Sequence, residues 1–133
     1  MRMQHFAAAI VATAAFASAA PASAHHSPLA QFDLNNPVTV RGTLAKIDWS
    51  NPHAWIYVNV KGADGKTQEW KIEAGSPLRM EKRGLEKGFF QPGSEVIIGG
   101  FGARDKTNTL AGWVVSFPAR ESAGQESSFA LGR

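Results

Sequence analysis

Alternating hydrophobic and polar positions divide the middle of the chain into segments typical of β-strands. The pattern is clearest in residues 55–60, where Ile56, Val58 and Val60 share one face of an extended chain. Similar patterns, bounded by turn signals at Asp64-Gly65 and Pro92-Gly93, predict four more strands. These strands cover residues 38–49, 67–74, 95–103 and 109–117.

The first of these segments changes phase along its length. Val40 and Leu44 have one parity, whereas Ile47 and Trp49 have the other, and Gly42 lies close to the change. A change of parity within a strand predicts a β-bulge or a sharp bend. A strand of this length can also pair in two sheets.

The last segment keeps one phase throughout. Ala111, Trp113, Val115 and Phe117 alternate with the residues between them, and Pro118 ends the pattern. The sequence therefore places these four side chains on one face of the strand.

One short helix is predicted between the third and fourth strands. Ser76 is suited to the N-cap, Pro77 to the first helical position, and Gly84 to the left-handed residue that ends a helix. Leu85 follows this glycine and is expected to pack against Met80.

The resulting order, β-β-β-α-β-β with a bent first strand, predicts the fold class. It is the order of a small five-stranded OB-fold-like Greek-key barrel, all-β with one short helix, here over residues 38–118. A β-sandwich is the alternative and needs more strands than this chain shows. Residues 119–133 are rich in Ser, Gly and Gln and are expected to be disordered. A fold of this kind does not by itself name a function.

The N-terminal residues have the pattern of a signal peptide. A polar start that includes Arg2 precedes an apolar run over residues 6–20, and Pro21 and then Ala22-Ser23-Ala24 follow it. We expect cleavage after Ala24, although an uncleaved N-terminal anchor is the alternative. Cleavage predicts a periplasmic or secreted protein with no transmembrane segment, whose mature N-terminal arm spans residues 25–37.

Composition narrows the classes of partner. Cleavage leaves 109 of the 133 residues, with 13 basic and 11 acidic side chains, which suits one small domain. This charge is too small to indicate nucleic acid binding. The chain has no cysteine, so export brings no disulfide.

Several motifs occur in an order that resembles a known family. They are "HHSPLAQFD" from His25, "NPHAW" from Asn51, a "DG…EW" hairpin, "GSP…RMEKRGL" and "PGSEV". Together they are similar to a family of short, exported bacterial proteins of unknown function, with a mature HHS start and a central NPHAW motif. The resemblance implies export and a small β-barrel, and it supplies no activity.

The histidines suggest a copper site. If His25 is the first mature residue, its α-amine and ring Nδ1 can chelate one metal ion, and nitrogen ligands favour Cu(II). His53, after Pro52, is the favoured third ligand, while His26 offers a competing mode with its own amide and ring. Alternatively, His25 and His26 bind copper without a biological function, and His53 only orders its own turn through backbone hydrogen bonds. Asp33 is an axial or outer ligand, or it caps a local turn.

A second hypothesis needs no metal. With Ile56 and Val58 pointing inward, Trp55 and Tyr57 point outward on the face that OB-folds use for ligands. Exposed aromatic pairs can bind a peptide, a saccharide or another protein. The alternative is that other parts of the chain cover them.

No arrangement of nucleophile and base indicates an enzyme. The chain has no cysteine, no Gly-x-Ser-x-Gly and no HExxH motif. A copper-dependent oxidase built on His25 is the enzymatic alternative, and we do not expect it because so short a chain leaves little room for a substrate pocket.

Overall fold

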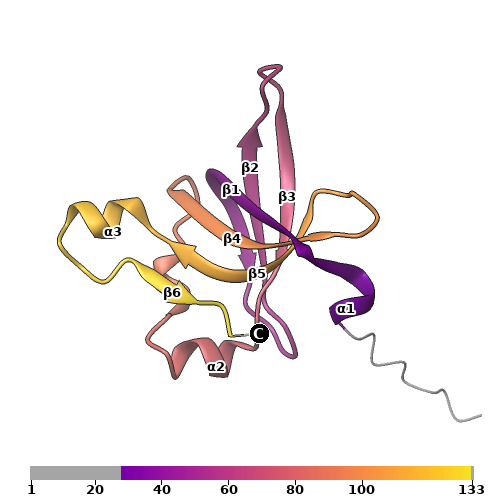
Figure 1. The fold of residues 1–133 in the computed structure, drawn as a ribbon. Helices are drawn as coiled ribbons and strands as arrows, with labels where there is room; N and C mark the ends of the chain where they lie inside the picture. The colour runs from indigo at the N-terminus through magenta and orange to yellow at the C-terminus, as the bar shows by residue number, and fades with distance from the viewer. Residues whose placement is uncertain (1–27, 133) are drawn as a thin grey trace, which may run out of the picture.

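The computed structural model describes residues 28–132 of the 133-residue chain. These residues form an antiparallel β-sheet that closes on itself, with short helices at its ends (Figure 1). The strands are β1 (Phe32–Asp48), β2 (Trp55–Lys61), β3 (Thr67–Glu73), β4 (Glu95–Ala103), β5 (Thr109–Ser116) and β6 (Ser128–Ala130). The helices are α1 (Pro28–Gln31), α2 (Pro77–Glu81), the 3-10 helix η1 (Lys87–Phe89) and α3 (Pro118–Ser122).

Five of the strands form a hydrogen-bonded ring. The sheet order is β3-β2-β1-β4-β5-β6, and β3 also pairs with β5 in parallel, with Ile72 opposite Leu110. The ring therefore runs β1-β2-β3-β5-β4, with α2 and η1 between β3 and β4. This arrangement confirms the predicted fold class as a mostly β protein whose sheet forms a near-barrel ring of five strands.

Strand β1 pairs with two neighbours. Residues 37–43 pair with β4, whereas residues 43–48 pair with β2. The predicted bulge is confirmed, and it lies at Ala45, where the register with β2 shifts between Leu44 and Lys46. Gly42 serves a different purpose, because a Cβ there would overlap the carbonyl oxygen of Asn59 on the partner strand.

The N-terminal arm differs from the prediction. The expected barrel begins at residue 38, whereas β1 already begins at Phe32, directly after α1. Phe32 pairs with Ala103 at the far end of β4 and is buried there. The sequence did not show this extension because the pairing partner lies about seventy residues away along the chain.

The predicted disordered tail is also corrected. Residues 118–122 form α3, and residues 128–130 form β6 along the edge of β5. Phe129 and Leu131 are buried in the main core. Leu131 accepts a hydrogen bond from Gly75 N–H (2.6 Å) and donates its own N–H to Trp113 (2.9 Å). Two apolar side chains therefore order a segment whose average composition is polar.

Strand β5 contains a second bulge, which the sequence did not predict. Gly99 pairs with Val114 but Gly100 pairs with Gly112, so Trp113 is the extra residue. The prediction that Ala111, Trp113, Val115 and Phe117 share one face is therefore wrong. Val115 and Phe117 belong to the main core, whereas Ala111 packs in a separate cluster and Trp113 is exposed.

The local signals around α2 are confirmed. Ser76 Oγ accepts a hydrogen bond from Arg79 N–H (3.4 Å), and Pro77 begins the helix. Gly84 has a positive φ of 84°, and Leu85 N–H bonds to the carbonyl oxygen of Met80 (3.0 Å). This is the expected Schellman closure.

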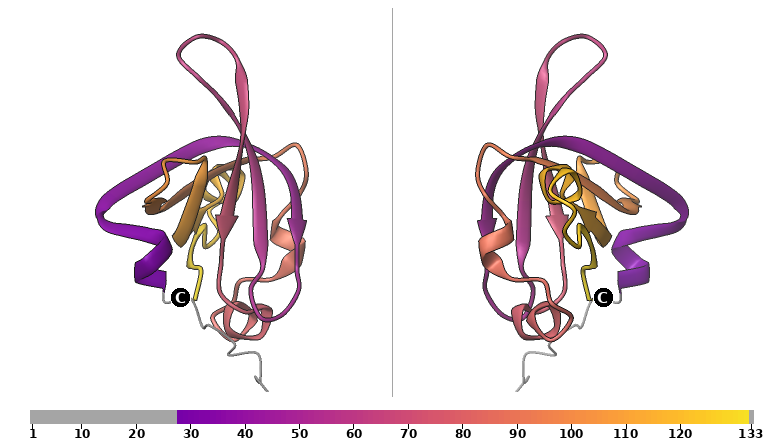
Figure 2. Two further views of the ribbon diagram at one scale, coloured as in Figure 1. Left: turned by 90° about the vertical axis from the view of Figure 1, so that its right-hand side faces the viewer. Right: turned by 90° about the vertical axis from the view of Figure 1, so that its left-hand side faces the viewer.

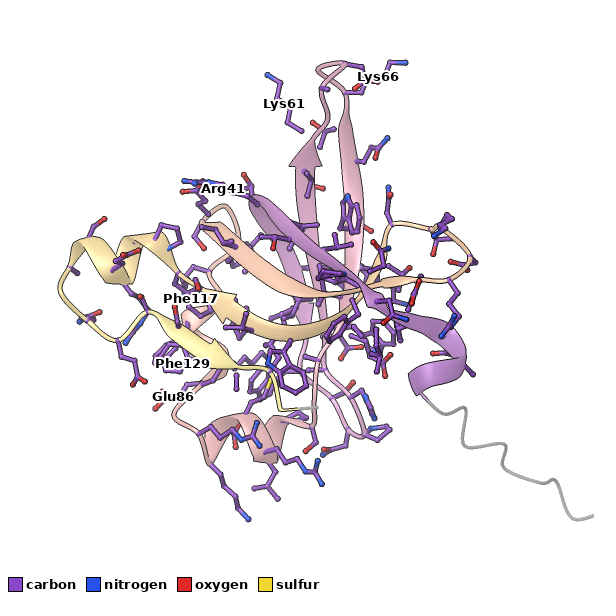
Figure 3. All side chains as sticks on the ribbon, in the orientation of Figure 1. Arg41, Lys61, Lys66, Glu86, Phe117 and Phe129 are labelled. Carbon is purple, nitrogen blue, oxygen red and sulfur yellow. The ribbon has the colours of Figure 1, made fainter. Side chains whose placement is uncertain are left out.

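The apolar side chains form a large cluster inside the ring and a small one outside it. The inner cluster includes the aromatic rings of Phe90, Phe117 and Phe129, whose centroids lie 5.2 to 6.2 Å apart in edge-on contacts. Figure 3 shows Phe117 and Phe129 beside one another near β5 and β6, whereas Lys61 and Lys66 extend from the hairpin tip. The outer cluster consists of Phe32, Ala103 and Ala111, with Phe101 against it.

The two ends of the barrel carry different structures. The β2–β3 hairpin extends beyond the ring at one end, and α2 with the C-terminal segment covers the other end (Figure 2). The candidate site lies beside this second end.

Candidate functional site

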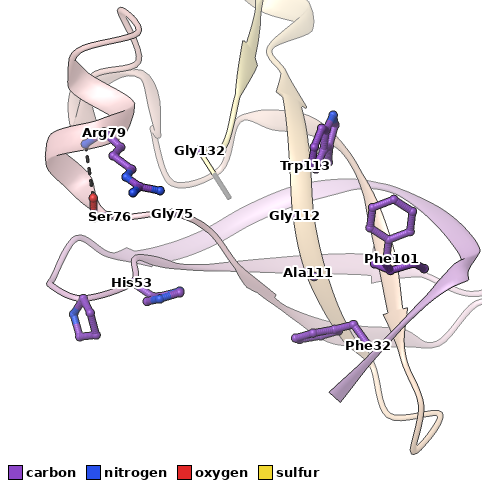
Figure 4. Close-up of a pocket in the computed structure, with 12 residues that line it drawn as sticks. Phe32, His53, Gly75, Ser76, Arg79, Phe101, Ala111, Gly112, Trp113 and Gly132 are labelled. Atoms are coloured by element: carbon purple, nitrogen blue, oxygen red, sulfur yellow. Dashed lines mark hydrogen bonds between the residues drawn. The ribbon is translucent and has the colours of Figure 1, made fainter. Parts of the chain in front are cut away.

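A cavity of about 560 Å³ lies outside the barrel, against the outer face of β5 (Figure 4). The first residues of β1 and the C-terminal part of β4 bound it on one side, and the loop before β2 and the start of α2 bound it on the other. It is lined by Phe32, Leu34, Pro52, His53, Gly75, Ser76, Arg79, Phe101, Ala111, Gly112, Trp113 and Gly132.

One wall of the cavity is apolar and partly open to solvent. Phe32 is buried, but Leu34 is 49% exposed and Trp113 is 60% exposed. The rings of Phe101 and Trp113 meet edge to face, with centroids 6.4 Å apart. The bulge in β5 places Trp113 here, because an unbroken alternation would leave no extra residue at this point. The wall therefore combines a supported aromatic surface with apolar area that the described residues leave uncovered.

The opposite wall is polar. Arg79 and Ser76 come from the start of α2, and His53 comes from the loop after Pro52. Figure 4 shows the Arg79 side chain extending from the helix on the same side as His53, across β5 from Trp113 and Phe101. The Ser76 hydroxyl is engaged by the backbone of its own helix.

His53 is held by a buried carboxylate. Its Nδ1 lies 2.7 Å from Oε1 of Glu73, the last residue of β3, which is ion-pair distance. This buried nitrogen has no partner of hydrogen-bond geometry among the described residues. The Glu73 residue is 8% exposed, whereas the His53 side chain is 39% exposed. Since Nδ1 is buried beside the carboxylate, Nε2 is the ring nitrogen left for a ligand.

The comparison with protein families assigns this chain. A model of a family of unknown function, DUF6152, matches residues 12–111. The chain belongs to the DUF6152 family. The match includes His53, Glu73, Arg79 and Phe101 of the site, and it ends at Ala111, just before Trp113. A comparison with curated proteins finds no match.

The predicted copper ligands of this DUF6152 protein are only partly visible. His25 and His26 lie outside the described residues, so their approach to His53 stays a prediction. Within residues 28–132, no three His, Asp or Glu side chains gather in a group that suits a metal ion. Asp33 accepts a hydrogen bond from the backbone N–H of Asn35 (3.1 Å), as expected for a local cap.

Trp55 and Tyr57 lie on the outer face of β2, as predicted. Ile56 and Val58 between them are fully buried, while the two aromatic residues are half-buried. Lysine side chains cover their rings, with the Lys71 ammonium 4.1 Å from the Trp55 centroid and that of Lys46 4.3 Å from Tyr57. Trp55 also lines a smaller hollow of about 400 Å³ beside Gln31 and Arg104.

Sequence reasoning missed most of the cavity. His53 was a candidate because a histidine after Pro52 stands out, but Phe101 and Arg79 look like ordinary strand and helix residues. Trp113 was assigned to the face of Val115, and only the unpredicted bulge separates them. Among the described residues, no helix has the length and apolar composition needed to cross a membrane.

Proposed function

We propose that this protein is an exported binding module whose ligand is a small organic molecule held in the cavity beside β5. The observation that carries the proposal is the exposure of Trp113 and Leu34 on one wall of a 560 Å³ cavity. Exposed apolar side chains gathered in a hollow of this size are typical of ligand sites, which usually measure about 300–1,000 Å³.

Two further features support binding. The aromatic wall is held in place, since Phe32 is buried against the barrel and Phe101 supports Trp113. The polar groups are few and converge from the opposite wall, which is how such sites orient a ligand. Export rests on the sequence of residues 1–24 and places the module in the periplasm or outside the cell.

Binding of a neutral aromatic dye tests the proposal. Phenylnaphthylamine should gain fluorescence with the wild-type protein, and Trp113→Ala should weaken its binding about two- to tenfold, because an aromatic contact contributes roughly 0.5–1.5 kcal/mol. Tyr57→Ala is the control, since it removes an aromatic ring from the other candidate face. Loss of binding with Tyr57→Ala and not with Trp113→Ala would place the site on β2 and contradict the proposal.

Copper binding is the second candidate function, and the His53–Glu73 contact favours it. A carboxylate beside Nδ1 of a histidine whose Nε2 binds the metal is a frequent arrangement around metal ions, and Glu73 lies at this position beside His53. We propose that the α-amine and ring of His25, freed by cleavage, supply the other nitrogen ligands, with His26 as the competing ligand. Cu(II) is the metal that such a nitrogen set prefers.

The copper proposal has a direct test. Intact mass of the exported protein establishes whether His25 is its first residue, and Cu(II) titration then compares it with a variant carrying one extra Ala before His25. The added residue should weaken binding strongly because it removes the amine chelate. Equal affinity in the two forms, or no effect of His53→Ala, would contradict the proposed site.

A further inference from the structure

We infer that the ligand of the cavity beside β5 is an amphipathic organic anion, whose acidic group binds Arg79 while its apolar body lies against Trp113 and Phe101. This inference rests on the proposed binding function and adds the chemical class of the ligand. It comes from the charges around the cavity, which are distributed unevenly.

Arg79 is the fixed charge on the lining. Its side chain is exposed and makes no ion pair with a described residue, whereas the Arg41 side chain is paired with Glu95. A guanidinium presents a planar set of donors that matches a carboxylate, sulfonate or phosphate group. Arg79 thus offers donors to a ligand without first having to break an ion pair within the described residues.

No acidic side chain competes for that position among the described lining residues. Two carboxylates lie near the site along the chain, Asp33 between Phe32 and Leu34 and Glu73 two residues before Gly75, and neither is part of the described lining. Asp33 Oδ1 accepts a hydrogen bond from Asn35 N–H, and Glu73 Oε1 lies 2.7 Å from Nδ1 of His53. The titratable groups on the described lining are then one arginine and one histidine, and neither repels an anion.

The rest of the lining excludes a simple inorganic anion as the whole ligand. Phe101, Trp113 and Leu34 provide a broad apolar surface, and an inorganic ion would leave that surface in contact with water. A ligand with an aromatic or branched apolar body would cover this surface, and Figure 4 shows Arg79 on the opposite side of β5 from Trp113 and Phe101. The apolar wall and Arg79 together therefore indicate a ligand that carries an apolar body and an acidic group in one molecule.

Two dyes that differ in a single acidic group separate the inference from the function on which it rests. Anilinonaphthalene sulfonate carries the sulfonate, and phenylnaphthylamine has nearly the same rings without it. We expect Arg79→Gln to weaken binding of the sulfonate on the order of tenfold, the effect of losing one charge-assisted hydrogen bond. Binding of the neutral dye should stay unchanged.

Arg83→Gln is the matched control, because it removes the same charge one turn further along, from a residue outside the described lining. If the two arginine variants weakened binding of the sulfonate equally, the effect would come from the net charge of the protein and not from a contact with Arg79. This outcome would overturn the inference. An equal effect of Arg79→Gln on both dyes would also overturn it, while the proposed binding function would stand. Failure of both dyes to bind the wild-type protein would overturn the function and the inference together.

Discussion

At the scale of single residues, the loop between β4 and β5 shows how one side chain sets the ionisation of another. Asp105 Oδ1 accepts a hydrogen bond from the Thr107 hydroxyl (2.7 Å) and another from the Thr107 backbone N–H (3.0 Å). Both bonds favour the ionised carboxylate, the hydroxyl more strongly, and they lower the pKa of Asp105. The loop is exposed and borders the hollow beside Trp55.

Thr107→Val should therefore raise the pKa of Asp105 toward its ordinary value. A carboxyl whose pKa is lower in the folded chain stabilises the fold above its unfolded pKa, and this contribution is lost as the pH falls through the folded pKa. The difference in free energy of unfolding between wild type and Thr107→Val should hence be larger at neutral pH than in acid. NMR titration of the Asp105 carboxyl carbon measures the pKa directly.

The Thr107 hydroxyl also lies 3.2 Å from the Thr109 hydroxyl, so Thr109→Val is the control that removes this second contact alone. This variant keeps both bonds to Asp105, so the pKa of Asp105 should not move. A similar rise in both variants would show that the hydroxyl of Thr107 does not control the carboxyl.

At the scale of elements, local chemistry made part of the structure predictable. The helix α2 follows from Ser76, Pro77 and Gly84, since caps depend on residues within one turn of each other. The turns at Gly65 and Gly93 are equally local, and both glycines have the expected positive φ. Such signals are contained in a few neighbouring letters of the sequence, so they can be recognised without knowledge of the partner strands.

The elements that the sequence did not reveal depend on distant partners. The bulge at Trp113 lies where β5 changes partners along one edge, from β3 at residues 109–111 to β6 at residues 114–116. This bulge shapes the site, because Trp113 no longer shares the inward face of Val115 and instead lines the cavity. His53 was recognisable as a candidate, but its contact with Glu73 depends on how the loop after Pro52 meets the end of β3.

At the scale of the whole molecule, the C-terminal segment completes the barrel end beside the candidate site. Leu131 is fully buried between the start of α2 and β5. Two glycines leave the room for it: a Cβ at Gly75 would lie 2.6 Å from the Leu131 carbonyl oxygen, and one at Gly112 would lie 2.6 Å from Leu131 Cδ1. Gly75 and Gly112 also line the cavity, so the packing of Leu131 and the shape of the site are linked.

Leu131→Ala should therefore destabilise the whole fold by about 2–5 kcal/mol, the usual cost of truncating a buried leucine. Leu78→Ala makes the same chemical change on α2 at a side chain that is 58% exposed, and it should alter stability by no more than about 0.5 kcal/mol. Urea unfolding of both variants measures the two free energies. If the segment after α3 were a free tail, Leu131→Ala would be as neutral as Leu78→Ala. A clear separation between the two leucines would instead show that the last residues belong to the core and hold one side of the cavity in place.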